Sequence, residues 1–204
     1  MNVMKYSRRL IPTLAITIVL TAYSGALLSA SSAHHIGFSY VSGARNVWDW
    51  HEDNLFLDDE LSGVPIGLSY RFAGLFDSGF RLDAGVGPLV LIIGDVEYYD
   101  VPIQFSIGYG FFSSSYFRPY ARVGASFHIN DGDYLVDETN AGVIGAIGFE
   151  LGEPNGSVNF FMEASYDSTE VTFSTAESNE YFARRPLQED ILASDFMLTI
   201  GARF

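Results

Sequence analysis

The sequence has no cysteine, and its only lysine is Lys5. The absence of cysteine excludes disulfide bonds, thiolate metal ligands and a lipid anchor on cysteine. Soluble domains normally cover themselves with lysine and glutamate, so a chain almost without lysine is unusual for a protein surrounded by water. Basic residues are few altogether, 11 Lys and Arg against 25 Asp and Glu, for a formal net charge of −14. This acidic excess argues against a nucleic-acid partner, because the backbone phosphates would repel it.

Long apolar runs are also missing, except near the start of the chain. There a basic region consisting of Lys5, Arg8 and Arg9 precedes a mostly apolar stretch over 10–28. Small residues at 31–33 suit signal peptidase, so we expect a signal peptide over 1–33 and a β-barrel domain over 34–204. An uncleaved membrane anchor is the alternative, but residues 23–25 interrupt the run and a membrane helix needs about 20 apolar residues.

The rest of the chain contains eight stretches in which apolar and polar residues alternate, the two-residue repeat of a β-strand. The predicted strands are 36–42, 64–72, 80–91, 101–111, 120–129, 141–151, 158–166 and 196–204. Their connections alternate between short turns and generally longer polar loops. This asymmetry is typical of an up-and-down barrel in an outer membrane, with turns in the periplasm and loops outside.

The polar face of these strands decides between a membrane barrel and a soluble one. It consists mainly of Gly, Ser, Asn and Gln. A face with so few charged residues is unsuited to a water-exposed surface but suits a narrow lumen. Eight charged residues share this face, four basic and four acidic: Arg71, Arg81, Asp83, Arg122, Glu150, Glu163, Asp195 and Arg203. We expect them to pair in a buried ion network, because an unpaired buried charge costs several kcal/mol.

The last strand alternates strictly, with an apolar face formed by Phe196, Leu198, Ile200, Ala202 and Phe204. It is similar to the C-terminal membrane-insertion signal of bacterial outer-membrane barrels, although Ala202 stands where that signal usually has another aromatic residue. Together with the strand count and the loop asymmetry, the chain resembles the small eight-stranded outer-membrane proteins of the OmpA transmembrane-domain and OmpX kind. The predicted fold is therefore all-β, an eight-stranded antiparallel up-and-down transmembrane β-barrel behind a cleavable signal peptide.

The resemblance implies a monomer in the bacterial outer membrane, inserted by the barrel-assembly machinery, without a cofactor and in contact with lipid and lipopolysaccharide. It does not fix an activity, because this fold hosts adhesins, lipid A enzymes and narrow channels. We expect a non-enzymatic protein with a closed polar lumen that serves envelope integrity or surface interaction through acidic extracellular loops. The alternatives are a narrow channel gated by the lumen ion network and a lipid A-modifying enzyme.

The long loops carry most of the acidic residues, and we interpret them as a solvated surface that binds cations diffusely. Asn130, Asp131, Gly132 and Asp133 partly resemble a calcium loop but lack its closing glutamate. In the first loop, Trp48 and Trp50 favour an anchor at the membrane interface over a partner-binding tip.

Catalysis has one candidate pair, Ser126 and His128, with Glu150 or Glu163 as the carboxylate of a triad. Strand parity points both residues into the lumen, away from the acyl chains that a lipid A enzyme must reach. The sequence therefore disfavours an enzyme.

Overall fold

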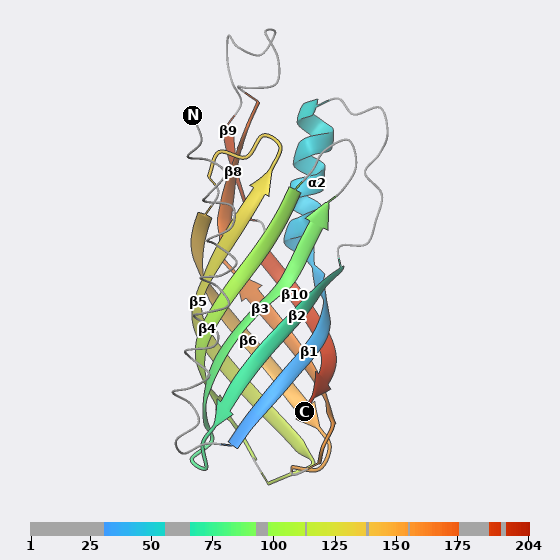
Figure 1. Cartoon of the computed structure of the whole chain (residues 1–204), viewed down its shortest axis with the longest axis vertical. Helices are drawn as coiled ribbons and strands as arrows, with labels where there is room; N and C mark the ends of the chain where they lie inside the picture. Colours follow the sequence, from blue (N-terminus) through green and yellow to red (C-terminus); the bar gives the residue numbers. More distant parts are fainter. Residues whose placement is uncertain are drawn as a thin grey trace, which may run out of the picture.

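The computed structural model describes residues 31–55, 66–92, 98–112, 114–137, 139–154, 156–175, 188–192 and 195–204. Eight antiparallel strands close into a barrel, in which each strand pairs with the next barrel strand along the chain (Figure 1). They are β1 (Ser31–Val41), β2 (Ile66–Leu75), β3 (Phe80–Ile92), β4 (Tyr98–Gly110), β5 (Phe117–Gly132), β6 (Thr139–Leu151), β7 (Asn159–Asp167) and β10 (Asp195–Arg203). The predicted eight-stranded up-and-down barrel is confirmed.

The first and last barrel strands close the cylinder. Strand β1 pairs with β10 from His35 opposite Arg203 to Val41 opposite Met197. At the end of this pair the amide of His34 donates to the carbonyl of Phe204 at 3.0 Å, and the amide of Phe204 donates back at 2.8 Å. No sheet edge is therefore left open between β1 and β10.

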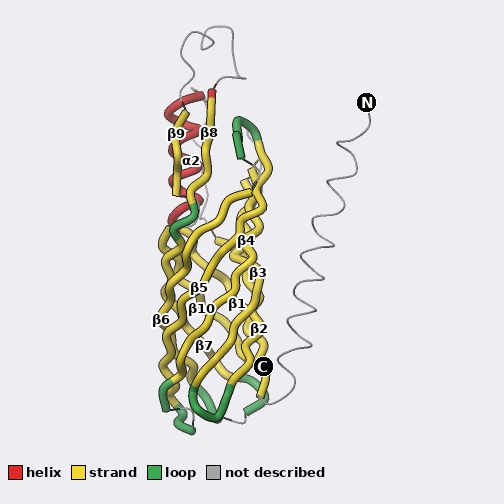
Figure 2. The backbone as a smooth tube through the Cα atoms, turned by 90° about the vertical axis from the view of Figure 1, so that its left-hand side faces the viewer, coloured by secondary structure: helices red, strands yellow, loops and turns green. Residues whose placement is uncertain are grey.

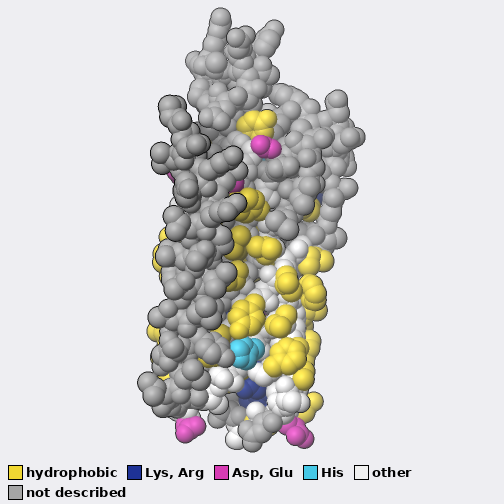
Figure 3. Space-filling view, in the orientation of Figure 1, with side chains coloured by type: hydrophobic (Ala, Val, Ile, Leu, Met, Phe, Trp, Pro, Cys, Tyr) yellow, Lys and Arg dark blue, Asp and Glu magenta, His cyan; other side chains and the backbone are white. Residues whose placement is uncertain are grey.

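The outer wall of the barrel is apolar. Large hydrophobic side chains that alternate with buried ones are exposed on every barrel strand, for example Phe38, Leu68, Leu82, Ile107, Val123, Ile147, Phe160 and Ile200. Figure 3 shows such side chains covering the visible part of the wall, with acidic groups at its two ends. Exposing this much apolar surface to water would be unfavourable, so the wall is suited to lipid.

The two ends of the barrel differ. At one end, strands are joined by short connections, such as 76–79 between β2 and β3. At the other end β3, β4 and β5 extend upwards beside a helix and a separate hairpin (Figures 1 and 2). In barrels of this kind the short turns face the periplasm, so we name the two ends periplasmic and extracellular.

The extracellular end contains structure where we expected polar loops. Helix α2 (Ser42–Leu55) follows β1 directly, and strands β8 (Glu170–Ser174) and β9 (Gln188–Leu192) pair into a two-stranded sheet outside the barrel. The loop prediction for these two segments is wrong. Residues 56–65 and 176–187, in the remainder of the same two connections, lie outside the described residues.

Strand β1 begins at Ser31, so its first three residues precede the expected cleavage point after Ala33. Residues 1–30 lie outside the described residues, and the signal peptide stays a prediction. Among the helices of the described residues, none has the length and apolar character to cross a membrane.

Candidate functional site

A network of charged side chains fills the periplasmic half of the lumen. Its centre is Glu163 on β7, which accepts hydrogen bonds from Arg71 and from Arg122, the latter at 2.8 Å. Arg71 also lies 3.4 Å from Asp83, and Asp83 in turn accepts from Arg81 at 2.8 Å. Glu163 and Asp83 each pair with two guanidinium groups, so the network links the strands β2, β3, β5 and β7 across the barrel.

Glu150 on β6 forms the lower part of this network. It lies 3.3 Å from Arg203, 3.4 Å from Arg118 and 3.7 Å from Arg81. On its other side Glu150 is 3.0 Å from the ring of His35. A single buried carboxylate therefore faces three arginines and one histidine.

Seven of the eight residues that the sequence assigns to the lumen network are brought together, namely Arg71, Arg81, Asp83, Arg122, Glu150, Glu163 and Arg203. Asp195 is not among them. It opens β10 at the extracellular end, with a positive φ of 42°, and its carboxylate accepts a long 3.4 Å bond from the Ser42 hydroxyl. Its assignment to the network is wrong, because it lies at the opposite end of β10 from Arg203.

Two members of the network were missed, His35 and Arg118. Both lie just before the starts that the sequence predicted for their strands, at 36 and at 120. Extending the same alternation by two residues or fewer places each of them on the lumen face, so the strand-length prediction caused the omission. Tyr120 shares the lumen face with Arg122, as the alternation of this strand requires. Its hydroxyl donates to Glu163 at 2.9 Å, and Arg81 stacks over its ring at 4.2 Å.

Little space remains inside the barrel around the upper network. A cavity of about 30 Å³ is lined by Arg71, Arg122 and Glu163 together with His35 and Gln104. Such a volume holds only a few water molecules, at roughly 10–15 Å³ each. The network therefore fills the barrel at this level.

A second polar cluster lies in the extracellular half of the lumen. His128 is completely buried and bridges two carboxylates, with Nδ1 2.9 Å from Asp100 and Nε2 3.2 Å from Asp167. The Ser126 hydroxyl donates to Asp167 at 2.8 Å, and Thr169 donates to the same oxygen at 2.7 Å. This cluster therefore joins the strands β4, β5 and β7 across the lumen.

This second cluster contains Ser126 and His128, the candidate pair for a catalytic triad, and shows their actual partners. Both Ser126 and His128 do face the lumen, as strand parity predicts. The carboxylates beside Ser126 and His128 are Asp100 and Asp167, whereas Glu150 and Glu163 bind arginines. The Ser126 hydroxyl hydrogen-bonds to carboxylate and hydroxyl oxygens and not to the imidazole, so a nucleophile paired with its general base is not formed.

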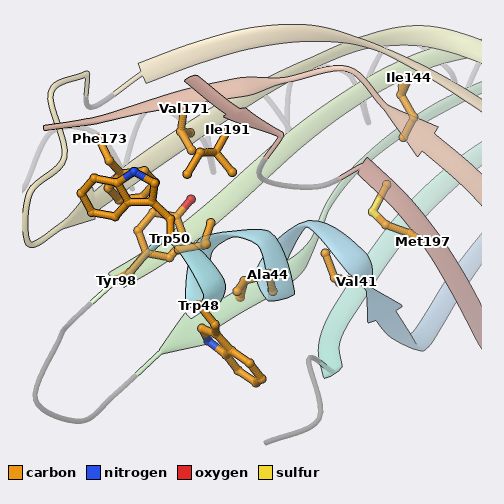
Figure 4. Close-up of a cluster of buried hydrophobic side chains, with 12 residues drawn as sticks. Val41, Ala44, Trp48, Trp50, Tyr98, Ile144, Val171, Phe173, Ile191 and Met197 are labelled. Carbon is orange, nitrogen blue, oxygen red and sulfur yellow. The ribbon is translucent and has the colours of Figure 1, made fainter. Parts of the chain in front are cut away.

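The extracellular mouth of the barrel is filled by an apolar cap. Its buried side chains come from helix α2, the β8–β9 hairpin and the upper ends of barrel strands: Val41, Ala44, Val47, Trp48, Trp50, Val90, Tyr98, Ile144, Val171, Phe173, Ile191 and Met197 (Figure 4). Phe173 stacks on Trp50 at a ring distance of 5.0 Å and meets Tyr98 at 5.7 Å. The cap joins the helix, the hairpin and the barrel into one hydrophobic core.

The tryptophans of the first loop are part of this cap. Trp48 and Trp50 are 8% and 4% exposed, so the expectation of a membrane-interface anchor is wrong, as is the alternative of a partner-binding tip. Ala44, Val47 and Trp48 lie at the spacing of one helix face, a helical signal that the alternating pattern elsewhere concealed.

His51 lies within the cap and is its histidine. Its ring packs against Phe173 and Trp50, each at 5.0 Å, and its Nδ1 lies 2.7 Å from the Val47 carbonyl oxygen. Burial lowers the pKa of His51 from its ordinary value of 6.5, and the backbone carbonyls that it contacts offset this only in part. The neutral imidazole is therefore the form that the cap favours.

Acidic groups dominate the extracellular surface. Asp49, Glu52 and Asp53 lie on α2, Asp131, Asp133 and Asp137 lie at and beyond the end of β5, and Glu170, Glu189 and Asp190 lie on the hairpin. Asn130 is buried in β5, so the expected calcium-like loop is a strand end instead. Among the described residues, no group of three or more His, Cys, Asp or Glu side chains is arranged to hold a metal ion.

A closed antiparallel barrel with an apolar wall and a charge-paired polar interior defines the class of small outer-membrane β-barrels. The apolar wall places such a barrel in a lipid bilayer. Scanning the sequence against protein-family models gives no match, and a search of curated proteins gives none either.

Among solved structures, the chain is similar to the outer membrane protein OprG from Pseudomonas aeruginosa, with a TM-score of 0.56 at 13% identity over 86% of this chain and 95% of OprG. It is also matched to Neisserial surface protein A (TM-score 0.45, 14% identity, 84% of this chain and 92% of that one). A third match is Ail, the attachment invasion locus protein of Yersinia pestis (TM-score 0.42, 13% identity, 87% of this chain and all of Ail). At these identities the similarity to OprG shows a shared fold, and the function of this chain has to be argued from its own residues.

Proposed function

We propose that this protein is a non-enzymatic outer-membrane barrel with a closed lumen, which serves envelope integrity or surface interaction through an acidic extracellular platform. The platform consists of α2, the β8–β9 hairpin and the upper ends of β3 to β5. The observation that carries the proposal is the apolar cap, because it holds the acidic segments in a fixed arrangement on the barrel instead of leaving them as separate loops.

Two features support a closed lumen. The cap fills the extracellular mouth, and the network around Glu163 fills the barrel below it. A solute would have to displace both a hydrophobic core and several charge-assisted hydrogen bonds, which are stronger than hydrogen bonds between neutral groups.

The charge of the platform supports a partner of opposite sign. The described part of the platform has many acidic residues and a single arginine, Arg45. The guanidinium group of Arg45 is itself paired with Asp49 at 2.8 Å. Divalent cations that bridge these carboxylates to the phosphates of neighbouring lipopolysaccharide would link the protein to its membrane without a dedicated metal site. A basic surface of an extracellular partner would fit the same platform.

Outer-membrane permeability tests the platform. In cells that depend on this protein, we expect Asp49→Asn, Glu52→Gln and Asp53→Asn together to increase the uptake of a hydrophobic dye at low Mg²⁺. The matched control is Asp77→Asn with Glu153→Gln, two exposed acids at the periplasmic end. Equal uptake by the platform variant and the wild type would argue against a role in envelope integrity.

Single-channel recording and lipid A analysis test the alternatives. We expect no discrete openings from the refolded wild-type protein in a planar bilayer. Openings that change with Glu150→Ala or Glu163→Ala would replace this proposal by a gated channel. A change in the mass spectrum of lipid A that requires the protein would replace it by an enzyme.

A further inference from the structure

The arginines of the described barrel strands are all gathered in the periplasmic half of the lumen. There the five guanidinium groups of Arg71, Arg81, Arg118, Arg122 and Arg203 face only three carboxylates, Asp83, Glu150 and Glu163. The interior of this strongly acidic protein is therefore locally basic. Buried positive charge in excess of its partners is costly, so such an arrangement favours a further anion.

The excess lies at the bottom of the network. Asp83 and Glu163 are each shared between two arginines, whereas Glu150 alone serves Arg118 and Arg203 and also approaches Arg81. Arg118 is 7% exposed, and its Nη2 has no hydrogen-bond partner, although its Nη1 donates to the carbonyls of Ser115 and Gly152. A buried guanidinium nitrogen without an acceptor is unusual, because leaving it unpaired costs the desolvation of a charged group.

A cavity lies against these groups. Its volume is about 460 Å³, and its lining includes Arg81, Arg118, Glu150 and Arg203 together with residues of the short turns, such as Asp77 and Pro154. This volume falls in the range of about 300–1,000 Å³ that is common for small-molecule sites. Because the short turns line it, the cavity is reached from the periplasmic side, and the capped extracellular mouth does not lead to it.

We propose that this periplasmic vestibule binds a small oxyanion of phosphate or carboxylate chemistry, held by Arg118 and Arg203 with Arg81 behind them. The planar guanidinium fork matches the paired oxygens of both anions, which a spherical anion cannot do. Among the described residues that line the cavity, Asp77 is the only acid besides the buried Glu150, and it is exposed, so water screens its repulsion. The site goes beyond the proposed function, because it lies at the opposite end of the molecule from the acidic platform.

Titration of the folded full-length protein with inorganic phosphate, in a non-ionic detergent at fixed ionic strength, tests the site by calorimetry or phosphorus NMR. We expect saturable binding of one phosphate per barrel. Arg118→Gln should weaken the affinity at least tenfold. The matched control is Arg45→Gln on the exposed side of α2, which should bind phosphate like the wild type.

Arg203→Gln provides a second variant should Arg118→Gln fail to fold, and electrophoretic mobility before and after boiling identifies the folded samples. Absence of saturable binding by the wild type would overturn the proposal. So would wild-type affinity in a folded Arg118→Gln or Arg203→Gln protein.

Competition distinguishes the sources of the oxyanion. Displacement of phosphate by dihexanoyl phosphatidylglycerol would identify a lipid headgroup of the inner leaflet. Displacement by acetate but not by this lipid would identify a free periplasmic anion.

Discussion

Glu163 has a central position in the lumen, because it binds Arg71, Tyr120 and Arg122 and is 3% exposed. Its neighbours can be satisfied only while the carboxylate is charged. Removing one partner of a buried ion pair is more destabilising than removing the whole pair, since it leaves an uncompensated charge behind.

We therefore expect Glu163→Gln to lower the free energy of unfolding by about 3–5 kcal/mol, because it removes the carboxylate that Arg71 and Arg122 share and leaves only Asp83 beside Arg71. Urea unfolding of the protein in lipid vesicles measures this loss. Glu170→Gln, on the exposed side of β8, is the control and should change stability by no more than about 0.5 kcal/mol. An unchanged midpoint for Glu163→Gln would show that the network contributes little.

His51 gives the cap a dependence on pH. Its pKa is lower in the folded cap than in the unfolded chain, so the cap gains stability above the ordinary pKa of 6.5 and loses it as the pH falls below that value. The only tryptophans of the protein, Trp48 and Trp50, both lie in the cap, so their fluorescence reports on the cap and not on the barrel. We expect the emission to shift to longer wavelength as the pH is lowered from 7 to 5.

His51→Phe keeps a ring against Phe173 and Trp50 but cannot titrate, and it should remove most of this shift. His34→Gln, at the periplasmic end of β1, is the matched histidine control and should retain it. An identical shift in His51→Phe would assign the acid response to another group.

At the scale of elements, the strands were readable from the sequence because each barrel strand obeys one physical rule, lipid on one face and lumen on the other. The alternation of Val101, Ile103 and Phe105 with Gln104 and Ser106 is a direct consequence of this rule, and the structure confirms that Gln104 and Ser106 are buried. The rule holds for most of the wall, and strand number and topology followed from it. Phe72 and Ile103, which it assigns to the lipid face, are only 6% and 7% exposed.

The cap was not readable in the same way, because its packing depends on contacts between distant segments. Val47 and Trp48 in α2 meet Phe173 and Ile191 of the hairpin, more than 100 residues away, in the core that includes all four. Many acidic residues surround these apolar ones and made both segments look like solvated loops. Pairing inside the lumen was likewise beyond the sequence, since strand parity places the arginines and the carboxylates on one face without showing which of them meet.

Phe173 tests how far α2 and the hairpin depend on each other. It is fully buried and touches Trp50, His51 and Tyr98, so Phe173→Ala should destabilise the cap by about 3–5 kcal/mol while the barrel stays closed. Hydrogen exchange should become faster in α2 and in β8, with little change in β4 and β5 below the cap.

Phe112→Ala is the matched control for that experiment, because Phe112 is 72% exposed at a periplasmic turn. It should leave exchange in the cap unchanged. Slow exchange of α2 in Phe173→Ala would mean that the helix is held by the barrel rather than by the hairpin.

At the scale of the whole molecule, the lumen is layered from outside to inside. An apolar cap comes first, then the cluster around His128, then the arginine network, and last the periplasmic vestibule. The layers separate the acidic outer surface from the basic interior. They also connect all eight barrel strands through side chains, in addition to the hydrogen bonds of the backbone.

Such a barrel should resist unfolding by detergent at room temperature. We expect the folded protein to migrate differently on a gel before and after boiling in sodium dodecyl sulfate, because only heat opens the closed strand pairing. Identical migration of both samples would contradict a closed barrel.

The pairing of β1 with β10 has a consequence for how the molecule forms. Ile36 lies opposite Ala202, so the contact that closes the cylinder joins positions separated by most of the chain. Contacts so distant in sequence slow folding, because the entropy of closing the loop is lost before the contact forms. Until that last pairing is made, two strand edges stay open to other chains, and the time spent in this state determines how readily the protein aggregates.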